Sequence, residues 1–218
     1  MVALIRYNLA AVVHGQRYLA PLLVFAIALS VFTINDQGPL TGSYVAAAGA
    51  LLPTMCWLTV TIINHEDPVR RSISVVLAGS STRVLFAEVL LALLAGLALT
   101  LVGLIFPILS GQHVWTGADL AAGAAALLTA AFTGTAVGVL CCRLVVPRPG
   151  YSLLLALVVV IALPLAHGLP PVNPMLRTLA GSGPPSDQLA PLTGDLLNSL
   201  VLLALCVAAA RFTATRHD

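Results

Sequence analysis

Residues 84–109 read VLFAEVLLALLAGLALTLVGLIFPIL, and this stretch decides the class of fold. Its only ionisable side chain is that of Glu88. A helix needs about 20 predominantly apolar residues to cross the hydrocarbon core of a bilayer, so this stretch is long enough to span a membrane. The whole chain is 59% hydrophobic and 8% charged, with a mean hydropathy of +1.02. Such a chain has too little polar surface for a soluble globule, which indicates an integral membrane protein.

Further apolar stretches flank this one, and the sequence predicts an all-α membrane protein with six transmembrane helices. The predicted spans are residues 19–34, 44–63, 84–109, 118–142, 151–166 and 192–210. The first and fifth are marginal in length and must include flanking residues to cross the hydrocarbon.

The arginines fix the expected orientation of these spans. The chain has ten cationic residues, all of them arginine, and nine lie in segments that the six spans place on one side of the membrane. These nine are Arg6, Arg17, Arg70, Arg71, Arg83, Arg143, Arg148, Arg211 and Arg216, whereas Arg177 lies on the opposite side. Positive residues in short loops stay cytoplasmic. We therefore expect a multi-pass protein of a bacterial inner (plasma) membrane with both termini in the cytoplasm.

Residues 1–18 differ from the transmembrane domain, which we assign to residues 19–218. Ile5, Leu9 and Val12 recur at helical spacing, while Arg6 and Arg17 lie off this stripe. The pattern predicts an amphipathic helix on the inner membrane surface, because arginine and glutamine are costly inside lipid. The alternative is that residues 1–18 simply lengthen the first span.

The segment after the second span predicts a short cytoplasmic helix over residues 67–78. Asp67 is a good helix N-cap, and Pro68 suits the first helical position, where its missing N–H is not needed. Gly79 stands where a helix stops. Apolar residues follow one helical face, at Val69, Ile73, Val76 and Leu77. With Arg70 and Arg71 beside it, this face can dock on lipid headgroups or in a groove of another protein.

The outer segment of residues 167–191 is rich in proline and glycine, yet residues 175–180 have a helical pattern. We interpret it as a broken helical hairpin at the outer membrane surface, since non-helical backbone at that depth must be buried in protein or line a wet cavity. An ordinary solvated loop is the alternative.

Residues that could carry chemistry are few. Without lysine, the chain has neither a P-loop lysine nor a Schiff-base lysine. The four cysteines lack Cys-x-x-Cys spacing and the five histidines lack helical pairing, so we expect neither a metal site nor catalytic residues. A basic domain for nucleic acid is also lacking. Glu88 and Asp195 are candidate functional acids within the spans, although their positions near span ends suit a structural role equally well.

Small residues and prolines indicate how the spans pack. Gly134 and Gly138 form a Gly-x-x-x-Gly step, which predicts a close approach of the fourth span to another helix. We expect Pro21, Pro53, Pro107 and Pro164 to kink or break the four spans that contain them.

These parts together resemble the transmembrane permease subunits of type-2 ABC exporters. Members of that family have an interfacial N-terminal helix, six spans, a cytoplasmic coupling helix between the second and third spans, and a re-entrant hairpin before the sixth. The matching parts here are residues 2–18, 67–78 and 167–191. The last part includes residues 169–177, LPPVNPMLR. The resemblance covers the whole chain and rests on layout and loop character, not on an invariant motif.

The resemblance implies a function and partners. Two six-span permease subunits, identical or different, would pair with two separate ATP-binding subunits that hold ATP and Mg and carry the catalytic residues. The coupling helix would sit in a groove of each ATP-binding subunit. Two alternatives stay open: a membrane scaffold or immunity-type protein that transports nothing, and an intramembrane enzyme.

Overall fold

The described part of the chain is entirely helical. The computed structural model describes residues 2–33, 38–65, 72–73, 75–77, 79–111, 116–142, 149–166, 170–181 and 184–215, and no strand occurs among them. Its helices are α1 (Val2–Gly15), α2 (Leu19–Thr33), α3 (Leu40–Ile63), α5 (Ser81–Ser110), α6 (Gly117–Leu140), α7 (Pro149–Leu165), α8 (Val172–Ala180) and α9 (Pro185–Thr215). The predicted all-α class is confirmed.

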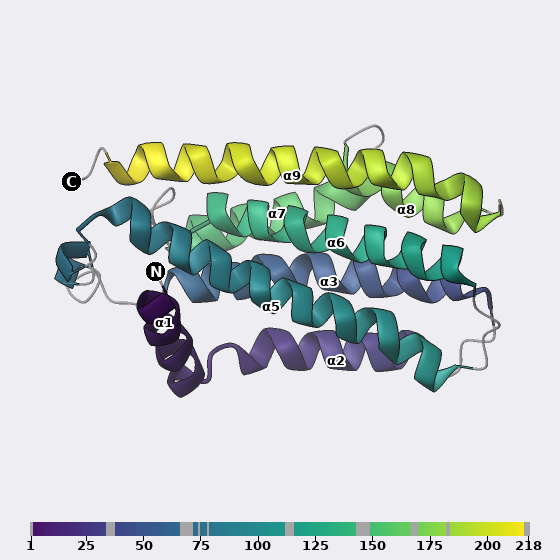
Figure 1. The fold of residues 1–218 in the computed structure, drawn as a ribbon, viewed down its shortest axis with the longest axis horizontal. Coiled ribbons are helices and arrows are strands. Elements are labelled where there is room, and N and C mark those ends of the chain that lie inside the picture. Colours follow the sequence, from purple (N-terminus) through teal and green to yellow (C-terminus); the bar gives the residue numbers. More distant parts are fainter. Residues whose placement is uncertain are drawn as a thin grey trace.

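The long helices lie side by side along the longest axis of the molecule, and α1 lies across them (Figure 1). The angle between residues Arg6–Gly15 and α2 is 76°. The chain turns at Gln16, whose φ of 51° lies in the left-handed region. Both ends of the described chain lie at one end of the bundle, and α8 lies toward the other (Figure 1).

The lengths of the helices define a multi-pass membrane protein, but not six spans. Four helices are long and apolar enough to cross a membrane: Leu40–Ile63, Ser81–Ser110, Gly117–Leu140 and Ser186–Thr213. A fifth crossing is reached if α1 and α2 are taken as one bent span. Helix α7 has 17 residues, which is about 25 Å at the α-helical rise, short of the ~30 Å hydrocarbon core.

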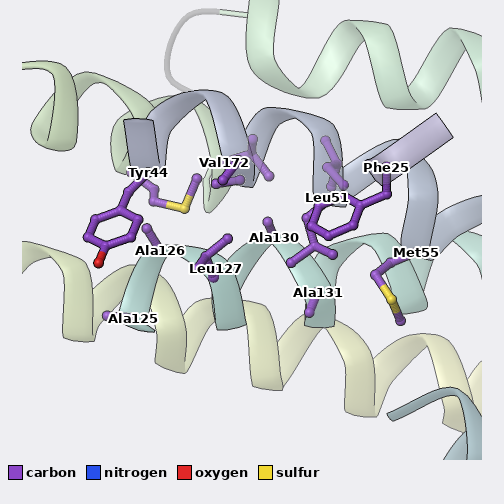
Figure 2. Packing of buried hydrophobic residues seen from close by; sticks show 14 of the residues in the cluster. Phe25, Tyr44, Leu51, Met55, Ala125, Ala126, Leu127, Ala130, Ala131 and Val172 are labelled. Carbon is purple, nitrogen blue, oxygen red and sulfur yellow. The ribbon is translucent and has the colours of Figure 1, made fainter. Parts of the chain in front are cut away.

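Helices α3 and α6 form the centre of the bundle. Within the apolar stretch of α6, 78% of the residues are buried, against 33% in α5 and 22% in α9. Tyr44, Leu51 and Met55 of α3 face the alanine-rich side of α6 (Figure 2). Phe25 of α2 and Val172 of α8 belong to the same cluster. The outer helices α5, α7 and α9 leave many of their large apolar side chains exposed, as helices that face lipid do.

The predicted glycine contact is confirmed, and its partner is α3. A Cβ added to Gly134 would lie 2.6 Å from the carbonyl oxygen of Leu52, and one added to Gly138 would lie 2.6 Å from the Cβ of Thr59. Because neither distance leaves room for a side chain, glycine at these two positions lets the two backbones touch.

Helix α8 is embedded in the bundle. It packs against α3, α6, α7 and α9, and its residues Val172, Met175 and Leu179 are buried. The side-chain amide of Asn173 donates a hydrogen bond to the carbonyl oxygen of Pro164 in α7 (2.6 Å). This hydrogen bond therefore connects α8 to the C-terminal end of α7.

The helices are not broken at their internal prolines. Helices α3, α5 and α7 continue through Pro53, Pro107 and Pro164. Helix α9 runs from Pro185 through Pro191 to Thr215, so the second arm of the expected hairpin is continuous with the last span. Packing against neighbouring helices stabilises an apolar helix enough to tolerate an internal proline.

Candidate functional site

The candidate partner-binding segment lies at the end of the bundle, between α3 and α5. Its described parts project beyond the long helices (Figure 1). Residues 72–73 and 75–77 are helical. The predicted residues Asp67, Val69, Arg70 and Arg71 lie outside the described residues.

Three of the predicted partner-coupling side chains are described, and all three are exposed. The exposed fractions are 56% for Ile73, 79% for Val76 and 83% for Leu77. Their spacing of three and four residues places them on one face of a helix. Exposed aliphatic side chains at this spacing form an apolar stripe that an apolar partner surface can cover.

Local sequence explains where this segment ends. Gly79 adopts a φ of 72°, which glycine reaches without the steric penalty that a side chain brings. Its N–H donates to the carbonyl of Val76 (3.3 Å). Ser80 is then the N-cap of α5 with an extended backbone, although its side chain makes no capping hydrogen bond. The helix stop predicted at Gly79 is confirmed, and the chain passes directly into α5.

The two candidate acids lie within helices, and both are buried. Glu88 is on α5, where its neighbours Leu85 and Val89 belong to an apolar cluster with residues of α3, α6 and α9. Asp195 lies on α9, one turn before the buried Ser199. Glu88 lies near the start of α5, and Asp195 lies in the first half of α9.

A third acid within the predicted spans has a structural role. The backbone N–H of Thr116 donates to Oδ2 of Asp119 (2.8 Å), and the N–H of Asp119 donates to Oγ1 of Thr116 (3.3 Å). This reciprocal pair is a capping box that satisfies orphan donors at the start of α6. Asp119 therefore stabilises a helix terminus.

Cysteine and histidine side chains form no metal centre in the described ranges, where no group of three or more possible ligands occurs. All four cysteines are buried free thiols. Cys56 and Cys141 belong to one apolar cluster with Val137, and Cys142 and Cys206 belong to another. In these surroundings they pack as small apolar residues.

One buried polar residue was missed by sequence reasoning. Asn8 of α1 is only 2% exposed, and its amide nitrogen has no hydrogen-bond partner among the described residues. Helix α1 packs against α5. Asn8 is four residues from Val12, which is also buried. This spacing places the two residues on the same helix face and could have indicated that Asn8 is buried.

The fold and the exposed segment define a multi-pass helical membrane protein with an apolar stripe at one end of its bundle. No protein-family model matches the chain, and no curated protein or solved structure matches it either.

Proposed function

We propose that this chain is the transmembrane permease subunit of an ATP-driven exporter and that it couples to a separate ATP-binding subunit. The observation that carries the proposal is the exposed apolar stripe of Ile73, Val76 and Leu77 at the end of the bundle. Three aliphatic side chains on one face, outside the long apolar helices, gain free energy when an apolar partner surface covers them.

The connection of this segment to the bundle supports a mechanical role. It follows α3, the most enclosed helix after α6, and leads through Gly79 into α5. A force on the stripe therefore reaches both helices by covalent connection. In the proposed cycle, closure of two ATP-binding subunits around ATP and Mg moves the segment and tilts the spans.

The close packing at the centre supports a cargo path between two permease subunits. Along the contact of α3 with α6, the carbonyl of Leu52 and the Cβ of Thr59 approach the glycine backbone too closely to leave a channel. Two copies of this chain, or this chain with a related one, would enclose the path between their bundles. Apolar walls with few charges favour an amphipathic or lipid-like cargo, because a charged solute needs compensating polar groups.

The proposed topology has six spans and both termini in the cytoplasm of a bacterial cell. Four of the five described arginines belong to segments at the end of the bundle with the stripe: α1 (Arg6), the turn between α1 and α2 (Arg17), the start of α5 (Arg83) and the last part of α9 (Arg211) (Figure 1). Positive residues mark the cytoplasmic side. In this arrangement the short α7 crosses with the help of its flanking residues.

The substitution Ile73→Asp tests the coupling role. A carboxylate in an apolar partner groove is costly, so the variant should lose binding of the ATP-binding subunit and transport. Ile73→Leu keeps the apolar surface and is the matched control. Both variants should elute as the wild type does in size-exclusion chromatography, because the side chain is exposed in the isolated chain. Unchanged partner binding and transport in Ile73→Asp would overturn the assignment of this stripe.

A further inference from the structure

Helix α1 carries three stripes of side chains that face different surroundings. Asn8 and Val12 are buried, and α1 packs on α5. Leu9 and Val13 are apolar and about half exposed. Arg6 and His14 are exposed and polar. Asn8 and Val12 are four residues apart, as are Leu9 and Val13, so each of these pairs shares a helix face. Arg6 and His14 are eight residues apart and lie on a third side of the helix, so the apolar stripe lies between the other two.

This order of stripes fits a helix at the edge of a bilayer. One stripe faces the bundle, the next faces acyl chains, and the third reaches the headgroups. The angle of 76° between residues Arg6–Gly15 and α2 sets the helix across the bundle axis, which is parallel to the membrane surface if α2 crosses it. Apolar and cationic faces in this order are typical of in-plane helices.

The charge around α1 has one sign. No acidic residue occurs before Asp36 in the sequence. Arg6 and Arg17 are exposed, and neither forms an ion pair or hydrogen bond with the described residues. The imidazole Nδ1 of His14 donates to the carbonyl of Ala10 (2.9 Å), so its Nε2 is the ring nitrogen left for another contact. The exposed cations are therefore available to anions from outside the described chain.

We propose that α1 and the turn after it bind anionic phospholipid headgroups, with Arg6 and Arg17 contacting the phosphates. Leu9 and Val13 contact the acyl chains of the same lipids. The site requires both the arginines and the apolar stripe. The arginines attract the anionic headgroups, and the apolar stripe inserts the helix into the acyl-chain region. This proposal depends on the membrane location of the bundle and not on the proposed transport function.

Titration of the purified full chain with phosphatidylglycerol or phosphatidylcholine, followed by native mass spectrometry, tests the site. The wild type should bind phosphatidylglycerol at least about tenfold more tightly than phosphatidylcholine, since each arginine near an anionic lipid contributes favourable electrostatic energy. The double variant Arg6→Ala with Arg17→Ala should lose most of this preference. Arg6→Lys with Arg17→Lys should keep most of it, because charge is retained.

Arg177→Ala is the matched control, because Arg177 is exposed on α8, toward the other end of the bundle. This variant should bind both lipids as the wild type does, and every variant should keep the wild-type melting temperature. Equal binding of the two lipids by the wild type would overturn the proposal. So would full retention of phosphatidylglycerol affinity in the double alanine variant. Equally tight binding of soluble glycerol 3-phosphate would identify a small-anion site instead, and would overturn the lipid assignment.

Discussion

Gly134 of α6 lies so close to Leu52 of α3 that a Cβ on the glycine would be 2.6 Å from the leucine carbonyl oxygen. The nearest atom is backbone, which cannot move aside as a flexible side chain can. Because glycine has no side chain at position 134, the backbones of α3 and α6 can pack directly against each other.

Gly134→Ala should separate α3 from α6 and destabilise the bundle by about 1–3 kcal/mol, the typical penalty for overpacking. Thermal unfolding in detergent measures the change. Gly49→Ala on α3 is the control, because a Cβ there meets no atom within 4 Å. That control should be neutral or gain up to about 1 kcal/mol from helix propensity. Equal melting temperatures for both variants would contradict the tight contact.

Tyr44→Phe should lower stability by about 1 kcal/mol, the usual net contribution of one hydrogen bond. The Tyr44 hydroxyl donates to the carbonyl oxygen of Leu104 in α5 (3.2 Å). The ring itself stays buried in the variant, so cavity formation does not contribute. We expect a lower unfolding temperature with an unchanged helical circular dichroism spectrum. A variant as stable as the wild type would show that the bond contributes nothing.

Asn8→Leu should stabilise the chain, because the buried amide nitrogen has no partner among the described residues. An unsatisfied buried donor costs about 1–3 kcal/mol, and leucine has a similar size. Asn8→Asp should have the opposite effect, since it introduces a buried charge. Melting temperatures of the two variants should move in opposite directions from the wild type. A lower melting temperature for Asn8→Leu would mean that the amide has a partner in the membrane.

The proposed orientation predicts which engineered thiols a membrane-impermeant maleimide reaches. In a background without the four native cysteines, which are buried, Ser110→Cys should react from outside the cell. Ser80→Cys should react only after the membrane is opened. These positions lie at opposite ends of α5, so one label is the control for the other. Reaction of Ser80→Cys in intact cells would reverse the topology.

Much of the helical framework could be predicted from the sequence, because a long apolar run in lipid must satisfy its backbone within a helix. The predicted span at residues 84–109 is α5, and the span at 118–142 is α6 within two residues at each end. The glycine contact and the stop at Gly79 followed from local backbone sterics.

Other features depended on tertiary contacts that a single sequence does not encode locally. The last span was predicted to begin at residue 192, but α9 begins at Pro185 and continues through Pro191. The side of α1 that meets α5 is chosen by packing, which is why Asn8 is buried although asparagine is polar. The identity of α3 as the partner of Gly134 required the fold, since a small-residue stripe specifies close approach but not the helix approached.

The proposed transport function requires that this chain work with a separate ATP-binding subunit. Affinity purification of the full chain from its native membrane, in mild detergent, tests this requirement most directly, with ATP hydrolysis assayed on the eluate. We predict a stoichiometric partner with a P-loop and Mg-dependent ATP hydrolysis, both lost when Ile73→Asp is purified in parallel and both kept with Ile73→Leu. A wild-type chain that purifies intact from its native membrane without such a partner and without ATP hydrolysis would contradict the proposed function.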